Sequence, residues 1–418
     1  MTELQEGQNP KSDASKAGEG VAPKALDGVK DAPGQALANK LDSVSLAAAS
    51  TNLITEPAPL VNSPVLIIGA GLLGASIGLA LTRAGVQVWL EDSSPTGLEL
   101  ACDLGAGQPL SAQPAPAPAL VVVATPPDVA GDVVVHALRN YPGAVVTDVA
   151  SVKEPIAKRV LECVPNLAQR YVGSHPMAGR ERSGAASARA DLFDARPWVL
   201  VATPATSPNA LSAVRQLAID LGALPTQLGA AEHDRAVALI SHTPQLVASA
   251  LAARLEQAPE VALNLAGQGL RDTTRIAASD PRLWAAILNA NRSSVAQVLR
   301  ELRVDIDALI EALEQGRASV GTVVDVMQRG NLGRDRIPGK HGGAPSRYAE
   351  VMVLIPDAPG QLARLFNDVG AAQVNIEDLV IEHSAGQRQG LATLLVAPAA
   401  AVGLRQALEQ QGWKIVAN

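Results

Sequence analysis

The chain has 418 residues, a formal net charge of −7 and only 18% charged residues. At roughly 150 residues per domain, this length suggests two or three domains. Lys and Arg are scattered and aromatic residues are few, which excludes a basic, aromatic-rich surface, so we expect no nucleic-acid partner. Cys102 and Cys163 lack a metal-type spacing, which excludes a disulfide framework and predicts no metal site. No secretion signal and no uninterrupted membrane-length apolar run is present, so we expect a cytoplasmic protein without a membrane partner.

Residues 1–62 contain few large apolar side chains, and we expect them to form a disordered tail. From residue 63 to about 229, short β-branched segments alternate with helix-length amphipathic stretches. This alternation predicts βαβ units and a Rossmann-type, doubly wound parallel sheet. The predicted strands are 65–70, 86–91, 120–124, 144–149, 171–175 and 198–202.

Residues 230–330 predict an all-α domain. The apolar residues Leu299, Leu302, Ile306, Leu309, Ile310 and Leu313 fall on one helical face. Such a long amphipathic helix predicts a homodimer formed through this domain. Residues 331–347 are rich in Gly, Arg and Pro and predict a linker. Residues 348–418 follow the order βαββαβ, which predicts a third, ferredoxin-like domain.

A dinucleotide-binding motif lies in the first predicted βα unit. Gly69, Gly71 and Gly74 give G-x-G-x-x-G directly after an apolar strand and directly before a helix. In this context the first glycine permits a tight turn, the second lets the backbone approach a pyrophosphate, and the third allows close helix packing. The motif predicts a nicotinamide dinucleotide cofactor.

The choice between NAD and NADP depends on the end of the second strand. Asp92 lies about twenty residues after the loop, where a carboxylate can accept hydrogen bonds from the ribose hydroxyls. This favours NAD, although the following Ser93 and Ser94 leave NADP open. Thr125 and Pro126 end the third main strand, at the edge where such sheets bind ligands. The predicted cofactor contacts are Gly69, Gly71, Leu72, Leu73, Gly74, Asp92, Thr125, Pro126 and Ser151.

Polar residues that could perform chemistry follow the later strands. His175 ends a predicted parallel strand and is a natural base for an alcohol proton. Ser151 could hydrogen-bond His175 or the nicotinamide, or it could cap the next helix. His242 lies inside a helix, either as a functional residue or as a core histidine. The two guanidiniums of residues 271–275 suit a carboxylated substrate, although they could also form a solvated charged face.

Several motifs occur in order along residues 64–330. They are the glycine loop, Asp148 to Lys153, Gly173 to Gly179 with Glu181, His233-Asp234, Ser241 to Pro244, Arg271 to Arg275, and Asp280 to Trp284. Through these motifs, residues 64–330 resemble the prephenate/arogenate dehydrogenase family. The resemblance implies that His175 hydrogen-bonds the ring hydroxyl of the substrate and that Ser151 orients it.

The resemblance also implies the rest of the substrate pocket. Arg275 would bind a substrate carboxylate, Glu181 and Asp272 would belong to the polar wall, and Asp234 would help to hold that wall. The chain departs from the family at Gln245, where many relatives have a histidine three residues after the one that matches His242.

Residues 348–418 resemble an ACT regulatory domain, which implies an amino-acid effector such as tyrosine. The alternative is a module that only promotes oligomerisation. The predicted effector contacts are Asp357, Pro359, Gly360, Asn375 and Ile376.

Three functional hypotheses follow. The first is a tyrosine-pathway dehydrogenase that acts on prephenate or on arogenate, with an allosteric C-terminal domain. The second is another Rossmann dehydrogenase, such as a 3-hydroxy acid enzyme, for which the helical domain lacks the expected catalytic Lys. The third is a regulator that binds nucleotide and amino acid without catalysis.

Overall fold

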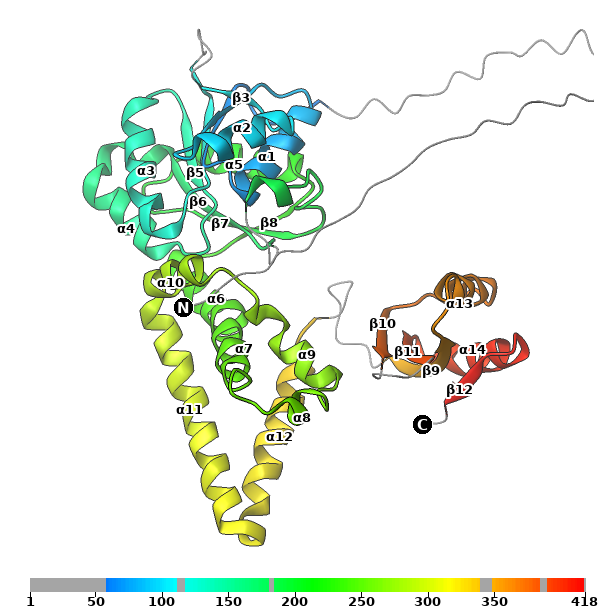
Figure 1. Cartoon of the computed structure of the whole chain (residues 1–418). Helices are drawn as coiled ribbons and strands as arrows, with labels where there is room; N and C mark the ends of the chain where they lie inside the picture. The colour runs from blue at the N-terminus through cyan, green and yellow to red at the C-terminus, as the bar shows by residue number, and fades with distance from the viewer. Residues whose placement is uncertain (1–57, 111–116, 180–183, 339–347, 384–388, 417–418) are drawn as a thin grey trace, which may run out of the picture. The chain divides into compact units, whose positions relative to one another are not determined.

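The computed structural model describes residues 58–110, 117–179, 184–338, 348–383 and 389–416 (Figure 1). Its first part is an eight-stranded sheet with helices on both faces. The strands are β1 (Val65–Ile68), β2 (Val88–Glu91), β3 (Gln108–Pro109), β4 (Leu120–Val123), β5 (Val145–Asp148), β6 (Tyr171–Pro176), β7 (Pro197–Val201) and β8 (Leu224–Gln227). The helices are α1 (Leu72–Arg83), α2 (Pro95–Asp103), α3 (Pro127–Asn140), α4 (Glu154–Cys163) and α5 (Pro208–Asp220).

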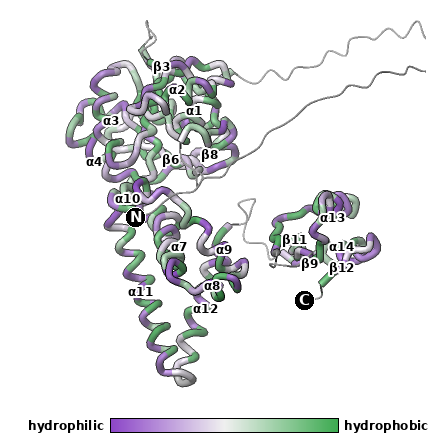
Figure 2. Tube along the Cα trace, viewed as in Figure 1, coloured by the Kyte–Doolittle hydropathy of each residue, from purple (hydrophilic) through white to green (hydrophobic). Residues whose placement is uncertain are grey.

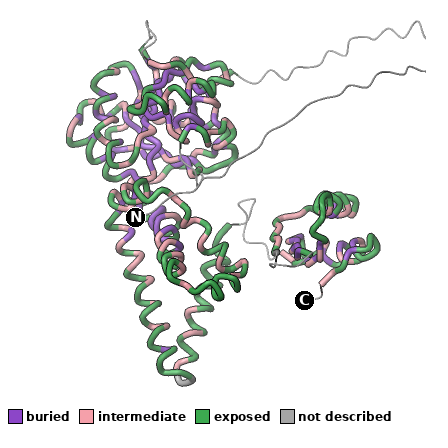
Figure 3. Tube along the Cα trace, in the orientation of Figure 1, coloured by how far each residue is buried: buried purple, intermediate pink, exposed green. Residues whose placement is uncertain are grey.

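Two hydrophobic cores sandwich this sheet. Because side chains alternate along a strand, Val65 and Ile67 of β1 pack with α1, α2 and α5, whereas Leu66 and Ile68 pack with α3 and α4. Figure 3 shows that the buried residues concentrate in this sheet. The predicted doubly wound Rossmann-type fold is confirmed.

The strand order is β3-β2-β1-β4-β5-β6-β7-β8. Its first six strands follow the order typical of dinucleotide-binding sheets. All pairs are parallel except β6 with β7, which is antiparallel, so the prediction of a parallel strand at 198–202 was wrong in direction. The described part of the β6–β7 connection contains only the short 3₁₀ turn η2 (Ala185–Ser187), and a parallel return requires a longer helical crossover.

The N-terminal edge of this part is more ordered than the sequence predicted. The backbone N–H groups of Leu60 and Val61 donate to the carboxylate of Asp220, at 3.0 and 2.7 Å, and Val61 is buried. Residues 58–62 are therefore fixed by α5, which corrects the predicted boundary of the tail. Residues 1–57 lie outside the described part of the chain.

The second part is helical, as predicted. It contains α6 (Ala230–Val237), the π-helical turn η3 (Ala238–His242), α7 (Thr243–Ala253), α8 (Glu260–Leu263), α9 (Gln268–Thr274), the 3₁₀ turn η4 (Arg275–Ala277), α10 (Pro281–Ala290), α11 (Arg292–Gln315), the 3₁₀ turn η5 (Gly316–Ser319) and α12 (Val320–Arg334). Since α12 continues to Arg334, the segment predicted as a linker begins with helical residues. The rest of that segment, 339–347, lies outside the described residues.

The predicted apolar face of α11 is only partly covered by the described residues. Ile306, Ile310 and Leu313 are exposed, and Val324 and Met327 are exposed on α12. Figure 2 shows the alternation of hydrophilic and hydrophobic residues along α11, and Figure 3 shows that most of this helix is exposed.

One described helical stretch, Ala230–Ala253, is long and apolar enough to cross a membrane by length and composition. It contains the buried residues His233, Asp234 and His242, which hydrogen-bond with other protein groups. These contacts place part of this stretch inside the protein.

The C-terminal part has the predicted βαββαβ order. Its elements are β9 (Ala349–Pro356), α13 (Gln361–Ala371), β10 (Asp378–His383), β11 (Gln389–Val396), α14 (Pro398–Gln410) and β12 (Lys414–Val416). The antiparallel sheet has the order β10-β11-β9-β12. Val351 and Val353 of β9 and Leu404 and Leu408 of α14 belong to its core.

Candidate active site

A cleft of about 1380 Å³ opens where β1, β4, β5 and β6 end. Parallel sheets of this type bind ligands at the carboxyl ends of their strands. The predicted residues Gly69, Gly71, Leu72, Leu73, Asp92, Thr125, Pro126, Ser151, His175 and His242 all line it.

The glycine loop has the shape that a pyrophosphate requires. Gly69 has a φ of +104°, and a Cβ there would lie 2.6 Å from the carbonyl oxygen of Ala124. A Cβ on Gly74 would lie 1.9 Å from the Gly69 oxygen, so α1 can approach the loop only with glycine there. Gly71 faces open space in the cleft. The first and third glycines therefore allow close packing, while the second leaves room for phosphates at the N-terminus of α1, so the loop fits the cofactor. Gly74 itself is buried and does not line the cleft.

Asp92 is fixed beside this loop. Its Oδ2 accepts a hydrogen bond of 2.6 Å from the backbone N–H of Ala70, and its Oδ1 accepts one of 2.7 Å from Ser94. A carboxylate has further lone pairs, so it can still accept from ribose hydroxyls. Asp92 therefore lines the cleft as a fixed carboxylate beside the glycine loop.

One face of α3 forms a wall of the cleft that the sequence prediction did not identify. Val129, Asp132, Val133 and His136 line the cleft from this helix. Their i, i+3, i+4, i+7 spacing shows that they share a face, but the sequence alone could not show which face points to the cleft.

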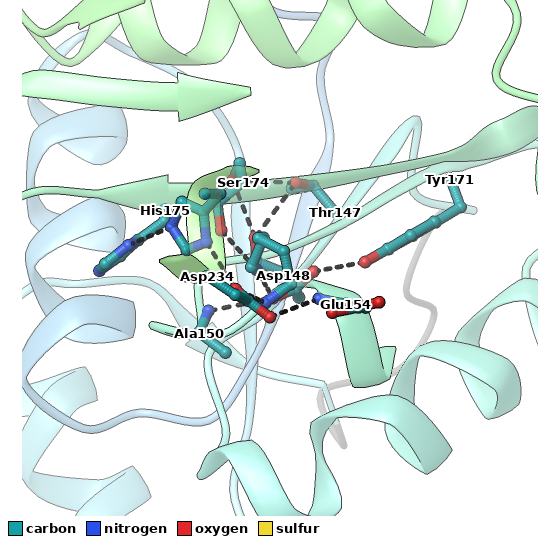
Figure 4. Close-up of polar contacts among 10 residues, drawn as sticks. Thr147, Asp148, Ala150, Glu154, Tyr171, Ser174, His175 and Asp234 are labelled. Atoms are coloured by element: carbon teal, nitrogen blue, oxygen red, sulfur yellow. Dashed lines mark hydrogen bonds and ion pairs between the residues drawn. The ribbon is translucent and has the colours of Figure 1, made fainter. Parts of the chain in front are cut away.

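His175 lies at the end of β6 and contacts the helical part of the chain. Its Nδ1 lies 2.9 Å from Nε2 of His233, and Nδ1 of His233 lies 2.7 Å from Oδ1 of Asp234. The two oxygens of Asp234 also accept from the backbone N–H groups of Lys153 and Glu154, at 2.8 and 2.9 Å. Figure 4 shows Asp234 beside His175 and the end of β5. The His233 contact was not predicted from the sequence, because its partners are 58 residues away along the chain.

Asp148 is the centre of a second, fully buried group of polar side chains below the strand ends. Its carboxylate accepts hydrogen bonds from Lys153 Nζ and from the Tyr171 hydroxyl, the latter at 2.8 Å. Lys153 also donates to the carbonyl oxygen of Ser174 at 2.7 Å. Burial raises the pKa of Tyr171 and lowers that of Lys153, and Asp148 opposes the shift of Lys153. This group fixes the residues on both sides of Ser151, and it also fixes Ser174, the residue before His175.

Ser151 lines the cleft and is not a helix cap. The N-terminal capping position of α4 belongs to Lys153, and Asp234 accepts from the first N–H groups of that helix. The capping alternative for Ser151 was therefore wrong, since the helix begins two residues later than that role requires.

The environment of His175 suits a base. Burial lowers its pKa well below 6.5, and the nearby His233, Lys153 and His242 lower it further. A neutral imidazole at neutral pH can accept a proton, whereas the imidazolium cannot.

His242 is the last residue of the π-helical turn η3. Pro244 has no N–H to complete the helical ladder, and an irregular turn here accommodates it. Nδ1 of His242 lies 3.1 Å from the side-chain amide of Asn291, and its ring packs edge-on to Trp284 with centroids 6.1 Å apart. His242 thus lines the cleft while being almost fully buried.

His242 makes stability dependent on pH. Burial lowers its pKa to about 4, so between pH 6.5 and 4 the unfolded chain binds a proton that the folded chain does not. The free energy of unfolding should therefore decrease as the pH falls, by about 2 kcal/mol from this histidine between pH 7 and pH 5. Urea unfolding of the wild type and of His242→Gln at both pH values tests this. Equal losses of stability in the two proteins would contradict it.

Two other predicted substrate residues, Arg275 and Asp272, do not line the cleft. Both are exposed, and Asp272 accepts a hydrogen bond of 2.7 Å from Gln268. Glu181 lies outside the described residues. Spacing along the chain does not determine which side of a helix faces the site, so the substrate roles of these residues stay predictions.

Gln245 is buried outside the cleft and binds the segment that follows Arg275. Its Nε2 donates to the Ile276 carbonyl oxygen at 2.9 Å and to the Ser279 hydroxyl at 2.8 Å. In the structure it joins α7 to η4 and does not line the cleft.

Replacing Gln245 by leucine should therefore lower stability. The change removes the Nε2 donor of the hydrogen bonds to the half-buried Ile276 and Ser279, and each lost hydrogen bond typically costs about 0.5–1.5 kcal/mol. Denaturant unfolding measures this loss. Gln297→Leu, on the exposed surface of α11, is the control and should change stability by less than about 0.5 kcal/mol. Similar values for the two variants would contradict the anchoring role.

The glycine loop and the neutral histidine define the class of protein, because together they can hold a nicotinamide dinucleotide and remove a proton from an alcohol beside it. The chain is a dehydrogenase of the Rossmann type. Two family models match it: Prephenate dehydrogenase, nucleotide-binding domain, over residues 77–225, and Prephenate dehydrogenase, dimerization domain, over residues 229–329.

Relatives of known sequence and structure agree with this class. A probable prephenate dehydrogenase of Streptomyces niveus, NovF, is 36% identical over 356 residues, which cover 83% of this chain and 98% of that protein. The structure of prephenate dehydrogenase from Aquifex aeolicus with hydroxyphenyl propionate and NAD+ matches with a TM-score of 0.57 and 28% identity, covering 65% of this chain and 99% of that one. Arogenate dehydrogenase from Synechocystis matches with a TM-score of 0.54 and 30% identity, over 65% and 99%. This chain belongs to the prephenate dehydrogenase family.

Proposed function

We propose that the protein oxidises and decarboxylates prephenate to 4-hydroxyphenylpyruvate in tyrosine biosynthesis, with NAD as the hydride acceptor. The observation that carries this proposal is the position of His175, which lines the same cleft as the glycine loop and has a lowered pKa. The identity of 36% with a probable prephenate dehydrogenase favours this substrate. Arogenate, which would give tyrosine directly, is the alternative substrate. We expect the enzyme to work in the cytoplasm.

The residues of the cleft suit this reaction. His175 accepts the proton of the ring hydroxyl through its free ring nitrogen, Nε2, and Ser151 orients the hydroxyl. The nicotinamide, when bound, accepts a hydride from the carbon that carries this hydroxyl. The carbonyl that forms takes up the electron pair of the bond to the quaternary carboxylate, which leaves as carbon dioxide. The ring becomes aromatic, and its oxygen recovers the proton from His175, so no net proton is released.

A rate comparison of the two substrates with the two cofactors tests the proposal. Formation of the reduced nicotinamide is followed by absorbance, with prephenate or arogenate and with NAD or NADP. We expect the highest kcat/KM with prephenate and NAD. A higher value with arogenate would favour the alternative, and no turnover with either substrate would overturn the proposal.

We also propose a homodimer formed through the helical part of the chain. The matched dimerization domain covers residues 229–329, and α11 and α12 expose large apolar side chains. Contiguous exposed apolar surface of this kind marks association sites. Sedimentation equilibrium should give twice the chain mass of 43.0 kDa.

The C-terminal part contains a second cavity, and we propose that it binds tyrosine as an effector. The cavity of about 410 Å³ is lined by residues 355–362 with Ile381 and Gly390, and these include the predicted Asp357, Pro359 and Gly360. Within the described residues, the buried Oε1 of Gln361 has no hydrogen-bond partner, so it could accept from an ammonium group. The predicted Asn375 and Ile376 do not line this cavity, and Asn375 donates to Glu377 at 2.8 Å.

Tyrosine binding to the full-length protein tests the effector hypothesis. Gln361→Leu should weaken binding at least tenfold in titration calorimetry, a loss of about 1.4 kcal/mol. Gln406→Leu, on the exposed face of α14, should bind like the wild type. If the wild type does not bind tyrosine, the module has another role, such as oligomerisation.

A further inference from the structure

The side chains of His175, His233 and Asp234 form a continuous line of hydrogen bonds that starts at the cleft and ends at the first turn of α4. Each contact is close: 2.9 Å between the two histidines and 2.7 Å between His233 and Asp234. The rings of the two histidines meet edge-on, with centroids 5.1 Å apart and an interplanar angle of 75°. His233 is fully buried and Asp234 is 2% exposed.

At the Asp234 end of this line, the carboxylate can only accept hydrogen bonds. Both carboxylate oxygens accept from backbone N–H groups, those of Lys153 and Glu154. A carboxylate that accepts on both oxygens has no proton to donate. The contact with His233 must therefore be made by an N–H on Nδ1 of His233.

The proton on Nδ1 of His233 determines which ring nitrogen of His175 is protonated. A neutral imidazole carries one N–H, so Nε2 of a neutral His233 is an acceptor. Nδ1 of His175, 2.9 Å away, must then carry the N–H. Nε2 of His175 is left with a free lone pair, which is the form that can remove a proton.

We propose that His233 and Asp234 are positioning residues that hold His175 in the tautomer with a free Nε2 and stabilise the imidazolium that forms when it accepts the substrate proton. This inference rests on the proposed function of His175 as the base. The comparable arrangement in serine proteases has a carboxylate in direct contact with the histidine, and loss of its charge gives the wrong tautomer. Here a second histidine lies between the carboxylate and the base.

Other groups around His175 do not supply this effect. Lys153 is paired with Asp148, and His242 is bound to Asn291. Both lower the pKa of His175 and so favour its neutral form. The carboxylate of Asp234 is the group in the line that can favour the cation.

The tautomer can be measured directly in the wild-type, full-length protein. Nitrogen-15 chemical shifts of labelled histidines distinguish a protonated from a free ring nitrogen. We expect His175, assigned by comparison with His175→Asn, to show N–H on Nδ1 and a free Nε2 at neutral pH. The opposite tautomer would overturn the proposal. Because no substrate is present, this result does not depend on the identity of the reaction.

Two variants of His233 separate positioning from packing. In His233→Gln, the amide oxygen can still accept from Nδ1 of His175, whereas in His233→Leu no acceptor remains. We expect kcat to fall at least tenfold in His233→Leu and to recover most of this loss in His233→Gln, with similar NAD affinity in both. Equal kcat values in the two variants would contradict the proposal.

The pH profile tests the role of the charge. Asp234→Asn removes the negative charge, so the acid limb of kcat/KM should move to lower pH and kcat should fall at least tenfold. The matched control is Asp220→Asn, since Asp220 also accepts from two backbone N–H groups but lies far from His175 in the fold, beside Leu60 and Val61. It should keep the wild-type profile. An unchanged acid limb in Asp234→Asn would overturn the charge role, and an inactive wild type would instead overturn the proposed reaction.

Discussion

His175→Asn should lower kcat by about 10²- to 10⁴-fold, which is the usual contribution of a positioned general base. Asparagine cannot accept and hold the hydroxyl proton, so hydride would have to leave a carbon whose hydroxyl is still protonated. His175 lies at the end of β6, away from the glycine loop of β1 and α1, and NAD affinity should therefore hardly change. The measurement is steady-state kinetics with saturating substrate, combined with a separate titration of NAD.

The unchanged NAD affinity is the control for correct folding in this experiment. A variant that loses both activity and NAD binding has lost the fold of the cleft and not only the base, and His175→Gln then provides a second test. A kcat close to that of the wild type, with normal NAD binding, would remove His175 from its role as the base.

The parallel sheet and the glycine loop could be predicted from the sequence because their signals are local. Val65 to Ile68 form an apolar segment, and the glycines follow it within six residues. Strand, tight turn and helix each depend on residues that are neighbours in the sequence. The structure confirms their predicted order. The same is true of the C-terminal βαββαβ order.

The direction of β7 and the network around His175 could not be predicted in this way. The antiparallel pairing of β7 depends on how the chain returns after β6, and the β-branched pattern of residues 198–202 is the same in either direction. Asp234 binds the backbone of Lys153 across 81 positions of sequence. Such contacts arise from packing between α6 and the start of α4, for which a single sequence has no local signal.

The substrate residues illustrate the same limit. His175, Ser151 and His242 come together in the cleft. His175 lies at the end of β6, Ser151 follows β5 at the same edge of the sheet, and His242 ends the irregular turn η3. Gln245 lies only three residues after His242, yet it points to η4. The π-helical turn ends at His242, before Gln245, so a spacing of three residues does not place these two side chains in the same pocket.

The choice of cofactor should depend on Asp92. Its carboxylate is fixed at the edge of the glycine loop by the N–H groups of Ala70 and Ser94, so it cannot move away from a ligand without losing these contacts. A 2′-phosphate there would bring two negative groups together, and NAD should be preferred. In Asp92→Asn, charge-assisted hydrogen bonds to the ribose are lost, and these are worth about 1.5–3 kcal/mol. The kcat/KM for NAD should fall about 10- to 100-fold, while that for NADP should rise.

A matched variant separates the local effect from the change in net charge. Asp103→Asn removes the same charge from the exposed end of α2, outside the lining of the cleft, and should keep the wild-type ratio of NAD to NADP. If both variants shift the ratio of NAD to NADP equally, the net charge of the domain determines the cofactor preference. If neither does, discrimination lies elsewhere on the cleft wall, and the face of α3 with Asp132 and His136 becomes the next surface to substitute. A shift confined to Asp92→Asn assigns the preference to this carboxylate, which is held in a fixed position beside the glycine loop.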